Sequence, residues 1–78
     1  MNLDDRRFLG QLGGRVRQIR TERGLTQAEL GERCGLHRTF VGSVERGERN
    51  VSVLNLRAIA KALRVEVGHL FADVTAEE

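Results

Sequence analysis

The sequence has little of what normally cross-links a small protein. Its 78 residues contain one cysteine, Cys34, so no internal disulfide can form. The two histidines stand far apart and, with a single cysteine, make no cluster typical of a structural zinc site. A chain this short buries only a modest core and is marginally stable by itself. The composition therefore favours a single domain, residues 1–78, that is stabilised by association into a dimer.

Long apolar runs and catalytic groupings are also missing. No segment approaches the roughly 18 apolar residues of a membrane-spanning helix, and the acidic Asp4 and Asp5 leave no apolar signal core at the start. We expect a cytoplasmic protein that makes no use of a membrane. No metal-ligand set or nucleophile with a nearby base is recognisable, and Cys34 is predicted to be a small core residue. The sequence predicts no catalysis, no metal, no cofactor and no small-molecule ligand.

The net charge of +2 is small, but its distribution along the chain is uneven. Residues 6–23 contain six arginines and one acid, Glu22, whereas residues 66–78 contain four acids and no Lys or Arg. A basic body with an acidic tail suits a polyanionic partner, although a solvated surface would carry the same charges. Single-stranded nucleic acid is disfavoured, because three Phe without Trp or Tyr offer little stacking surface.

The absence of proline and the recurrence of apolar residues at three- and four-residue spacing predict an all-α domain. The expected helices are five: a first ending near residue 23, then about 27–34, about 38–45, a fourth after Ser52, and about 66–71. Residues 10–71 form the expected core, followed by a frayed acidic tail over 72–78.

Two of these helices are short and separated by Gly35, Leu36 and His37 alone. Thr26, with Glu29 three residues later, has the pattern of a capping box that begins the first of them. A glycine-containing turn between two short helices is typical of a helix-turn-helix.

The chain resembles the lambda-repressor-like helix-turn-helix family, also called the Xre or Cro type. The resemblance covers about residues 10–71 and rests on Gly24, Leu25, Thr26, Gln27, Ala28, Glu29, Leu30, Gly35, Val41, Val44, Glu45, Arg46, Gly47, Arg49 and Asn50. Within that family, the pattern resembles the controller proteins of restriction–modification systems, on the run Arg38, Thr39 and Phe40 followed by Glu45, Arg46, Arg49 and Asn50. The resemblance implies a compact five-helix domain that binds double-stranded DNA as a homodimer and regulates transcription.

The second short helix is the expected recognition helix. Its start would present Arg38 to a guanine and Thr39 to a base or a thymine methyl, with Ser43 one turn later on the same side. Phe40 is ambiguous between a contact to DNA and a seal on the core, and we assign it to the base-reading set. The resemblance to controller proteins adds Arg49 as a residue that enters a groove.

Phosphate contacts are expected from residues at the first helix of the motif and from the loop after the recognition helix. These residues are Gln27, His37, Arg46, Asn50 and Ser52. The family resemblance further implies a partly buried ion pair between Arg20 and Glu45, which would tie the first helix to the recognition helix.

Apolar residues in excess of a small core predict the dimer interface. Leu54 falls off the buried stripe of the fourth helix, and Val67, Leu70 and Phe71 follow in the fifth. An interface in the C-terminal half leaves the recognition helix free, and the surface around Phe8 is the alternative. A second interpretation of the whole fold stays open: an antitoxin or adaptor that grips a protein partner.

Overall fold

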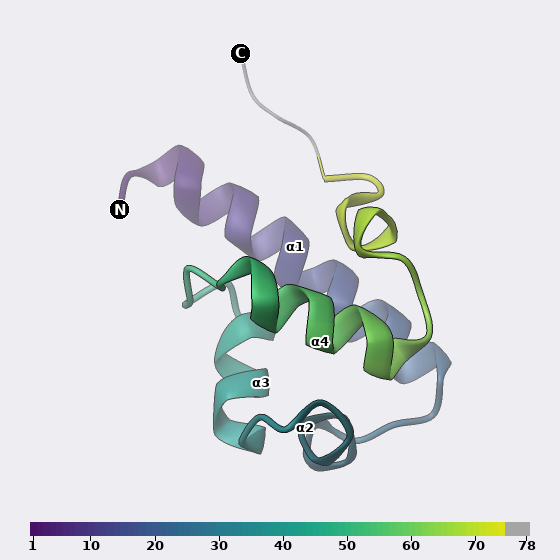
Figure 1. Cartoon of the computed structure of the whole chain (residues 1–78). Helices are drawn as coiled ribbons and strands as arrows, with labels where there is room; N and C mark the ends of the chain where they lie inside the picture. The colour runs from purple at the N-terminus through teal and green to yellow at the C-terminus, as the bar shows by residue number, and fades with distance from the viewer. Residues whose placement is uncertain (75–78) are drawn as a thin grey trace.

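The computed structural model describes residues 1–74 and contains no β-strand within them. Four α-helices follow one another, α1 (Leu3–Glu22), α2 (Gln27–Cys34), α3 (Arg38–Glu45) and α4 (Val53–Leu63), and a short 3-10 helix, η1 (Val67–Phe71), comes last. In Figure 1, α1 crosses behind α4, and α2 and α3 lie below them. The expected all-helical helix-turn-helix domain is present. Residues 75–78 of the predicted tail lie outside the described residues.

The two ends of the domain differ from the sequence-based expectation. The α1 helix begins seven residues before the predicted core boundary at residue 10, because Asn2 caps it: the Asn2 Oδ1 accepts a hydrogen bond from the Asp5 amide at 2.8 Å. The fifth helix is not an α-helix. It is a five-residue 3-10 helix without a side-chain cap, and such helices are seldom longer than about four residues.

One apolar core joins all five elements. On α1, α3 and α4 its residues recur at three- or four-residue spacing, so each of these helices buries one stripe, whereas α2 and η1 contribute one residue each. They are Leu12, Val16, Ile19, Leu25, Leu30, Val41, Val44, Leu56, Ile59, Ala60, Leu63 and Leu70.

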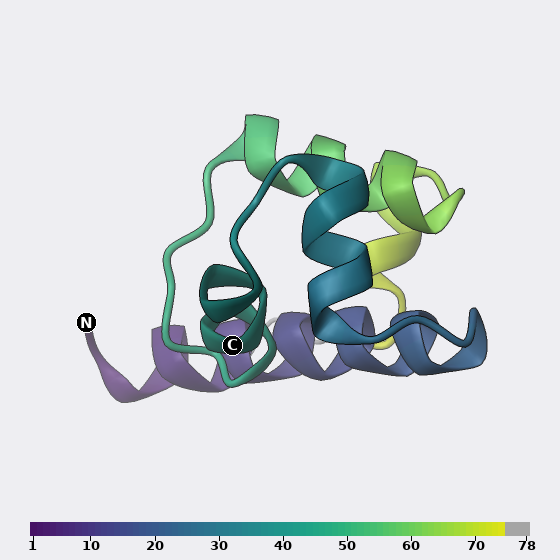
Figure 2. The same cartoon turned by 90° about the horizontal axis from the view of Figure 1, so that it is seen from below.

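The α2 and α3 helices form the helix-turn-helix. Figure 1 shows α2 end-on and α3 from the side, and Figure 2 shows the reverse, so their axes cross steeply. The capping box at Thr26 is formed, and Gly35 ends α2 in the left-handed conformation with φ 74°. A Cβ at Gly31 would overlap the Leu36 carbonyl oxygen, so glycine there permits the turn to close onto α2.

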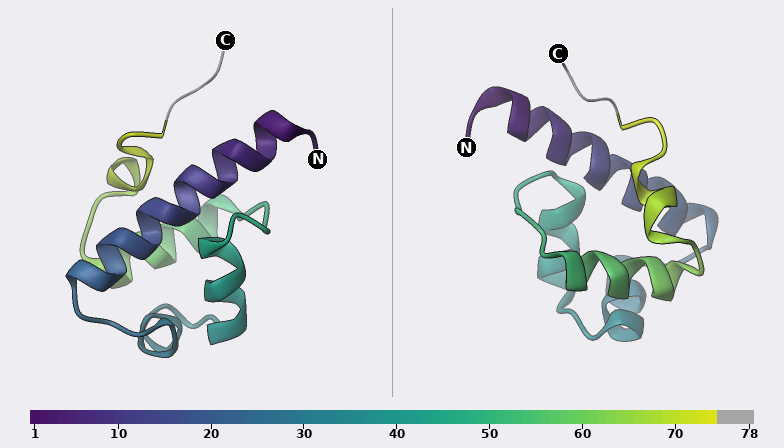
Figure 3. Two further views of the ribbon diagram at one scale, coloured as in Figure 1. Left: turned by 180° about the vertical axis from the view of Figure 1, so that it is seen from behind. Right: turned by 45° about the horizontal axis from the view of Figure 1, so that its top comes forward.

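The η1 turn packs against both α4 and α1 (Figure 3). Leu70 is fully buried beneath it. At the surface, the Arg15 Nε donates a hydrogen bond to the His69 carbonyl oxygen at 3.2 Å, and its Nη2 lies 2.8 Å from the His69 Nε2. These contacts fix η1 on the side of the molecule away from α3.

Candidate nucleic-acid interface

The start of α3 is the exposed part of that helix. Arg38 and Thr39 are both exposed, whereas residues 41–45 are buried. His37 caps the helix, since its Nδ1 accepts a hydrogen bond from the Thr39 amide at 3.0 Å. An accepting Nδ1 places the proton of a neutral imidazole on Nε2, which can then donate to an anion. A histidine therefore supplies the cap that a serine, threonine or aspartate more often provides.

Ser43 does not lie on the exposed side with Arg38 as the helical pattern predicts. It is 5% exposed, and its hydroxyl donates to the Phe40 carbonyl oxygen at 2.7 Å. The Ser43 Oγ also accepts a hydrogen bond from the Arg49 Nε at 3.1 Å. The reason is tertiary: α1 covers one side of α3 and the loop after α3 folds back over the other.

Arg49 is held by α3 at two points. Besides the bond to Ser43, its guanidinium carbon lies 5.5 Å from the centre of the Phe40 ring. Phe40 is half-buried, so one part of its ring seals the core while another supports Arg49. Arg49, predicted to enter a groove, is thus fixed beside the recognition helix.

The absence of a side chain at Gly42 lets Gln27 and Arg46 lie next to each other on the surface of α3. A Cβ at position 42 would lie 3.1 Å from the Arg46 Nη1 and 3.3 Å from the Gln27 Oε1. The two side chains therefore converge over α3 because the glycine has none. This groups two of the predicted phosphate contacts, one at the start of α2 and one directly after α3.

Arg46 is also paired within the protein. Its Nε donates to the Glu48 Oε2 at 3.0 Å and its Nη2 to the Glu48 Oε1 at 3.2 Å. Sequence reasoning assigned no role to Glu48. The only signal for it was a single acid between two arginines in an otherwise basic loop.

A buried network fixes α3 on the body of the domain. The Arg20 Nε and Nη2 donate to the two carboxylate oxygens of Glu45 at 2.6 and 3.0 Å, and Arg20 Nη1 donates to the Leu25 carbonyl oxygen at 2.6 Å. Gln27 adds a hydrogen bond from its Nε2 to the Glu45 Oε1 at 3.0 Å. Gln27 thus links the predicted DNA surface to this ion pair. The pair has the arrangement that the family resemblance implies.

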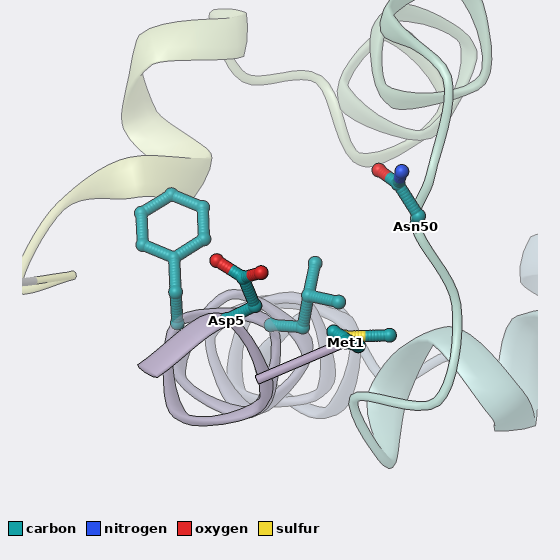
Figure 4. Close-up of a pocket in the computed structure, with 5 residues that line it drawn as sticks. Met1, Asp5 and Asn50 are labelled. Carbon is teal, nitrogen blue, oxygen red and sulfur yellow. The ribbon is translucent and has the colours of Figure 1, made fainter. Parts of the chain in front are cut away.

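Asn50 and Ser52, the other two predicted phosphate contacts in the loop, are exposed. The Ser52 hydroxyl caps α4 by accepting a hydrogen bond from the Asn55 amide at 3.1 Å. Asn50 faces a hollow of about 490 Å³ between the loop and the start of α1, where Met1 and Asp5 lie opposite it (Figure 4). Both residues lie in the loop that follows Arg49, on the way from α3 to α4.

Of the four predicted dimer residues, three are at least partly exposed and one is buried. Leu54 is 71% exposed, and Val67 and Phe71 are half-buried. Leu70 is wrongly assigned to an interface, because it is a core residue of the single chain with 0% exposure. Phe71 stacks on Phe8 with ring centres 6.2 Å apart, so the predicted surface and its alternative on α1 are contiguous.

Neither a metal centre nor a reactive thiol is evident in the part of the chain that the structure describes. No group of three His, Cys, Asp or Glu residues within residues 1–74 is arranged to hold a metal ion. Burial raises the pKa of the half-buried Cys34 thiol, which lowers its thiolate fraction. Among the same residues, no helix has the length and apolarity needed to cross a membrane.

The fold and the exposed start of α3 define a helix-turn-helix protein, and comparison with known families agrees. A helix-turn-helix family model matches residues 16–70, and the chain belongs to that family.

Several of its relatives are controller proteins. The control protein C.SmaI of Serratia marcescens is 49% identical over 59 residues, covering 76% of this chain and 70% of that protein. The control protein C.BamHI of Bacillus amyloliquefaciens is 47% identical over 55 residues, covering 69% and 68%. The crystal structure of the restriction–modification controller protein C.AhdI from Aeromonas hydrophila superimposes with a TM-score of 0.80 at 48% identity, covering 81% of this chain and 96% of that one.

Proposed function

We propose that this protein is a transcription regulator that binds double-stranded DNA at a pseudo-palindromic operator as a homodimer. The observation that carries the proposal is the exposed pair Arg38 and Thr39 at the start of a helix whose residues 41–45 are buried and whose last residue is hydrogen-bonded to α1. A recognition helix has to offer its N-terminal side chains to base edges while the rest of it stays rigid.

The contacts divide into two kinds. Arg38 can donate two hydrogen bonds to guanine, and Thr39 can contact a base or a thymine methyl. Arg49, supported by Phe40, extends this base-reading set into an adjacent groove. Phosphate contacts come from the neighbouring residues Gln27, His37, Arg46, Asn50 and Ser52, which fix the register of the helix on the duplex.

Ser43 no longer belongs among the base-reading residues. Its hydroxyl is buried and already makes two hydrogen bonds. We assign it the positioning of Arg49.

The homodimer is supported by the arrangement of the elements. Exposed Leu54 and half-buried Val67 and Phe71 belong to α4 and η1, and η1 lies on the side of the molecule away from α3. An isologous interface there would leave both recognition helices free for half-sites about 34 Å apart, one turn of the duplex.

The similarity to C.SmaI, C.BamHI and C.AhdI supports a narrower proposal, that the chain is a controller of a restriction–modification system. Such a role predicts genes for a methyltransferase and an endonuclease beside its own. Genes of a toxin in that place would instead favour the antitoxin interpretation.

Selection of duplexes from a random-sequence pool by the purified protein tests the DNA-binding role and does not require the operator sequence. We expect enrichment of one motif with two inverted half-sites centred about one helical turn apart. Arg38→Ala in a parallel selection should lose that motif. A pool that stays random with the unaltered protein, together with a stable complex with another protein, would replace this proposal with a protein-interaction module.

A further inference from the structure

Glu48 is an acid placed where the proposed function needs cations. It lies between Arg46, a proposed phosphate contact, and Arg49, a proposed base-reading residue. The hydrogen bond from Arg46, together with the positive charges of Arg46 and Arg49, holds the pKa of the Glu48 carboxyl below its ordinary value. Glu48 is therefore a carboxylate at neutral pH, and its charge acts on both arginines.

The pairing uses the side of Arg46 that would bind a phosphate. Glu48 accepts hydrogen bonds from Nε and from Nη2, the parallel pair with which a guanidinium holds either a carboxylate or a phosphate. The remaining nitrogen, Nη1, points toward Gly42 and Gln27. A DNA phosphate and Glu48 thus compete for the same two N–H groups.

The surroundings of the pair favour an anion once Glu48 is neutralised. Arg46 and Glu48 line a hollow of about 430 Å³ together with Arg6 and Met1. The carboxylate offsets one of the two guanidinium charges there. Without it, Arg6 and Arg46 would present two positive charges to a passing phosphate.

We propose that Glu48 is an internal competitor for DNA phosphate at Arg46, which lowers the affinity of the protein for every duplex and so raises the concentration at which the operator fills. This inference rests on the proposed function. It deepens that function, because it makes Glu48, a residue outside the proposed DNA contacts, one determinant of the protein concentration at which the operator is occupied.

The exposure of the pair sets the size of the effect. The two side chains are 58% and 56% exposed, so the pair is weak and yields readily to a phosphate. Because a dimer carries two copies, removing the competitor should raise affinity by about threefold to twentyfold. The increase should be similar on operator and random duplexes, since phosphate contacts carry no sequence information.

The experiment measures binding of Glu48→Gln to two duplexes of equal length, one carrying the selected motif and one scrambled, over a series of salt concentrations. We expect tighter binding to both. We also expect the affinity to depend more steeply on salt, by up to about one ion per subunit. Without Glu48, the charge of Arg46 would be free to replace a counterion on the DNA.

Two further variants make the result specific to Arg46. Glu32→Gln removes the same charge from an exposed position on α2 and should raise the affinity for DNA less than Glu48→Gln does. In an Arg46→Ala background, Glu48→Gln should lose most of its effect. An equal gain from Glu32→Gln, or an undiminished gain without Arg46, would mean that net charge alone is responsible.

The opposite sign is equally informative. Weaker binding by Glu48→Gln would mean that Glu48 orients Arg46 for its phosphate, and the competitor role would be wrong. If the unaltered protein binds the selected duplex and Glu48→Gln binds it identically, only this inference fails. If no form of the protein binds any duplex, the proposed function fails and this inference fails with it.

Discussion

Gly13 of α1 packs directly on the backbone of Val44 in α3, and a Cβ at position 13 would overlap the Val44 carbonyl oxygen. The neighbouring Glu45 carbonyl oxygen would lie 2.7 Å from the same atom. The two helices therefore meet backbone to backbone, which holds the recognition helix close to α1. Side chains elsewhere can adjust, but these carbonyl groups belong to a buried helix and cannot.

This contact predicts opposite effects for two adjacent glycines. Gly13→Ala should destabilise the protein by about 1–3 kcal/mol, because α1 and α3 must separate. Gly14 is exposed with open space around it, so Gly14→Ala should stabilise by about 0.5–1 kcal/mol through helix propensity alone. Urea unfolding of the two variants is the measurement. Equal effects of the two substitutions would contradict the close approach.

The buried ion pair leads to a second prediction. Glu45→Gln should lower the free energy of unfolding by about 2–3 kcal/mol, because Arg20 keeps its charge in a nearly buried site and loses its partner. Arg20→Met provides the other corner of a double-mutant cycle. Since the two side chains share two hydrogen bonds, the coupling should be large, and additive losses would mean that each acts independently.

Substitution of a base-reading residue and substitution of a phosphate contact should affect DNA binding in different ways. Arg38→Ala should cost about 1–3 kcal/mol on the selected duplex and much less on a scrambled one. Arg46→Ala should weaken binding to both duplexes alike and make the affinity less dependent on salt. The salt dependence should fall by less than about one ion per subunit if Glu48 already competes for Arg46. Titrations of both duplexes with both variants decide the matter. A uniform loss for Arg38→Ala would make it a phosphate contact.

The sequence predicted those parts of the fold that depend on local signals. The boundaries of α2 follow from the Thr26 capping box and from a glycine that tolerates a left-handed backbone at position 35. The cap of α1 at Asn2 was missed, although an asparagine with two acids in the turn that follows it is a local signal of the same kind. Short elements such as η1 gave no signal that separates a 3-10 turn from an α-helix.

The errors at the site have non-local causes. Helical periodicity places Ser43 near the exposed face, but it is buried because Arg49 returns from the loop to cover it. The interface assignment of Leu70 was wrong because the packing of η1 on α1 and α4 cannot be deduced from spacing. The pairing of Arg46 with Glu48 likewise depends on the loop conformation.

Ser43 can be distinguished as a positioning residue by its dependence on Arg49. Ser43→Ala removes the hydroxyl that accepts from the Arg49 Nε, so selectivity between the two duplexes should fall by about 0.5–1.5 kcal/mol with little change on the scrambled one. In an Arg49→Ala background the same substitution should have no further effect on selectivity. Thermal unfolding controls for damage to α3. A full effect without Arg49 would return Ser43 to direct base reading.

The dimer interface gives the last prediction. Leu54→Asp and Phe71→Asp should each produce monomers, because a charge would be buried in the centre of an apolar contact. Leu54→Asp is the cleaner variant, since Leu54 is 71% exposed in the single chain and an aspartate in the first turn of α4 suits the helix dipole. Operator binding should weaken strongly, because the two subunits that bind the half-sites would no longer be linked, whereas affinity for a single half-site should persist.

Leu3→Asp, at an equally exposed leucine near the start of α1, is the matched control and should leave the dimer intact. Sedimentation that finds monomers for Leu3→Asp and dimers for Leu54→Asp would move the interface to the first helix, next to the stacked rings of Phe8 and Phe71.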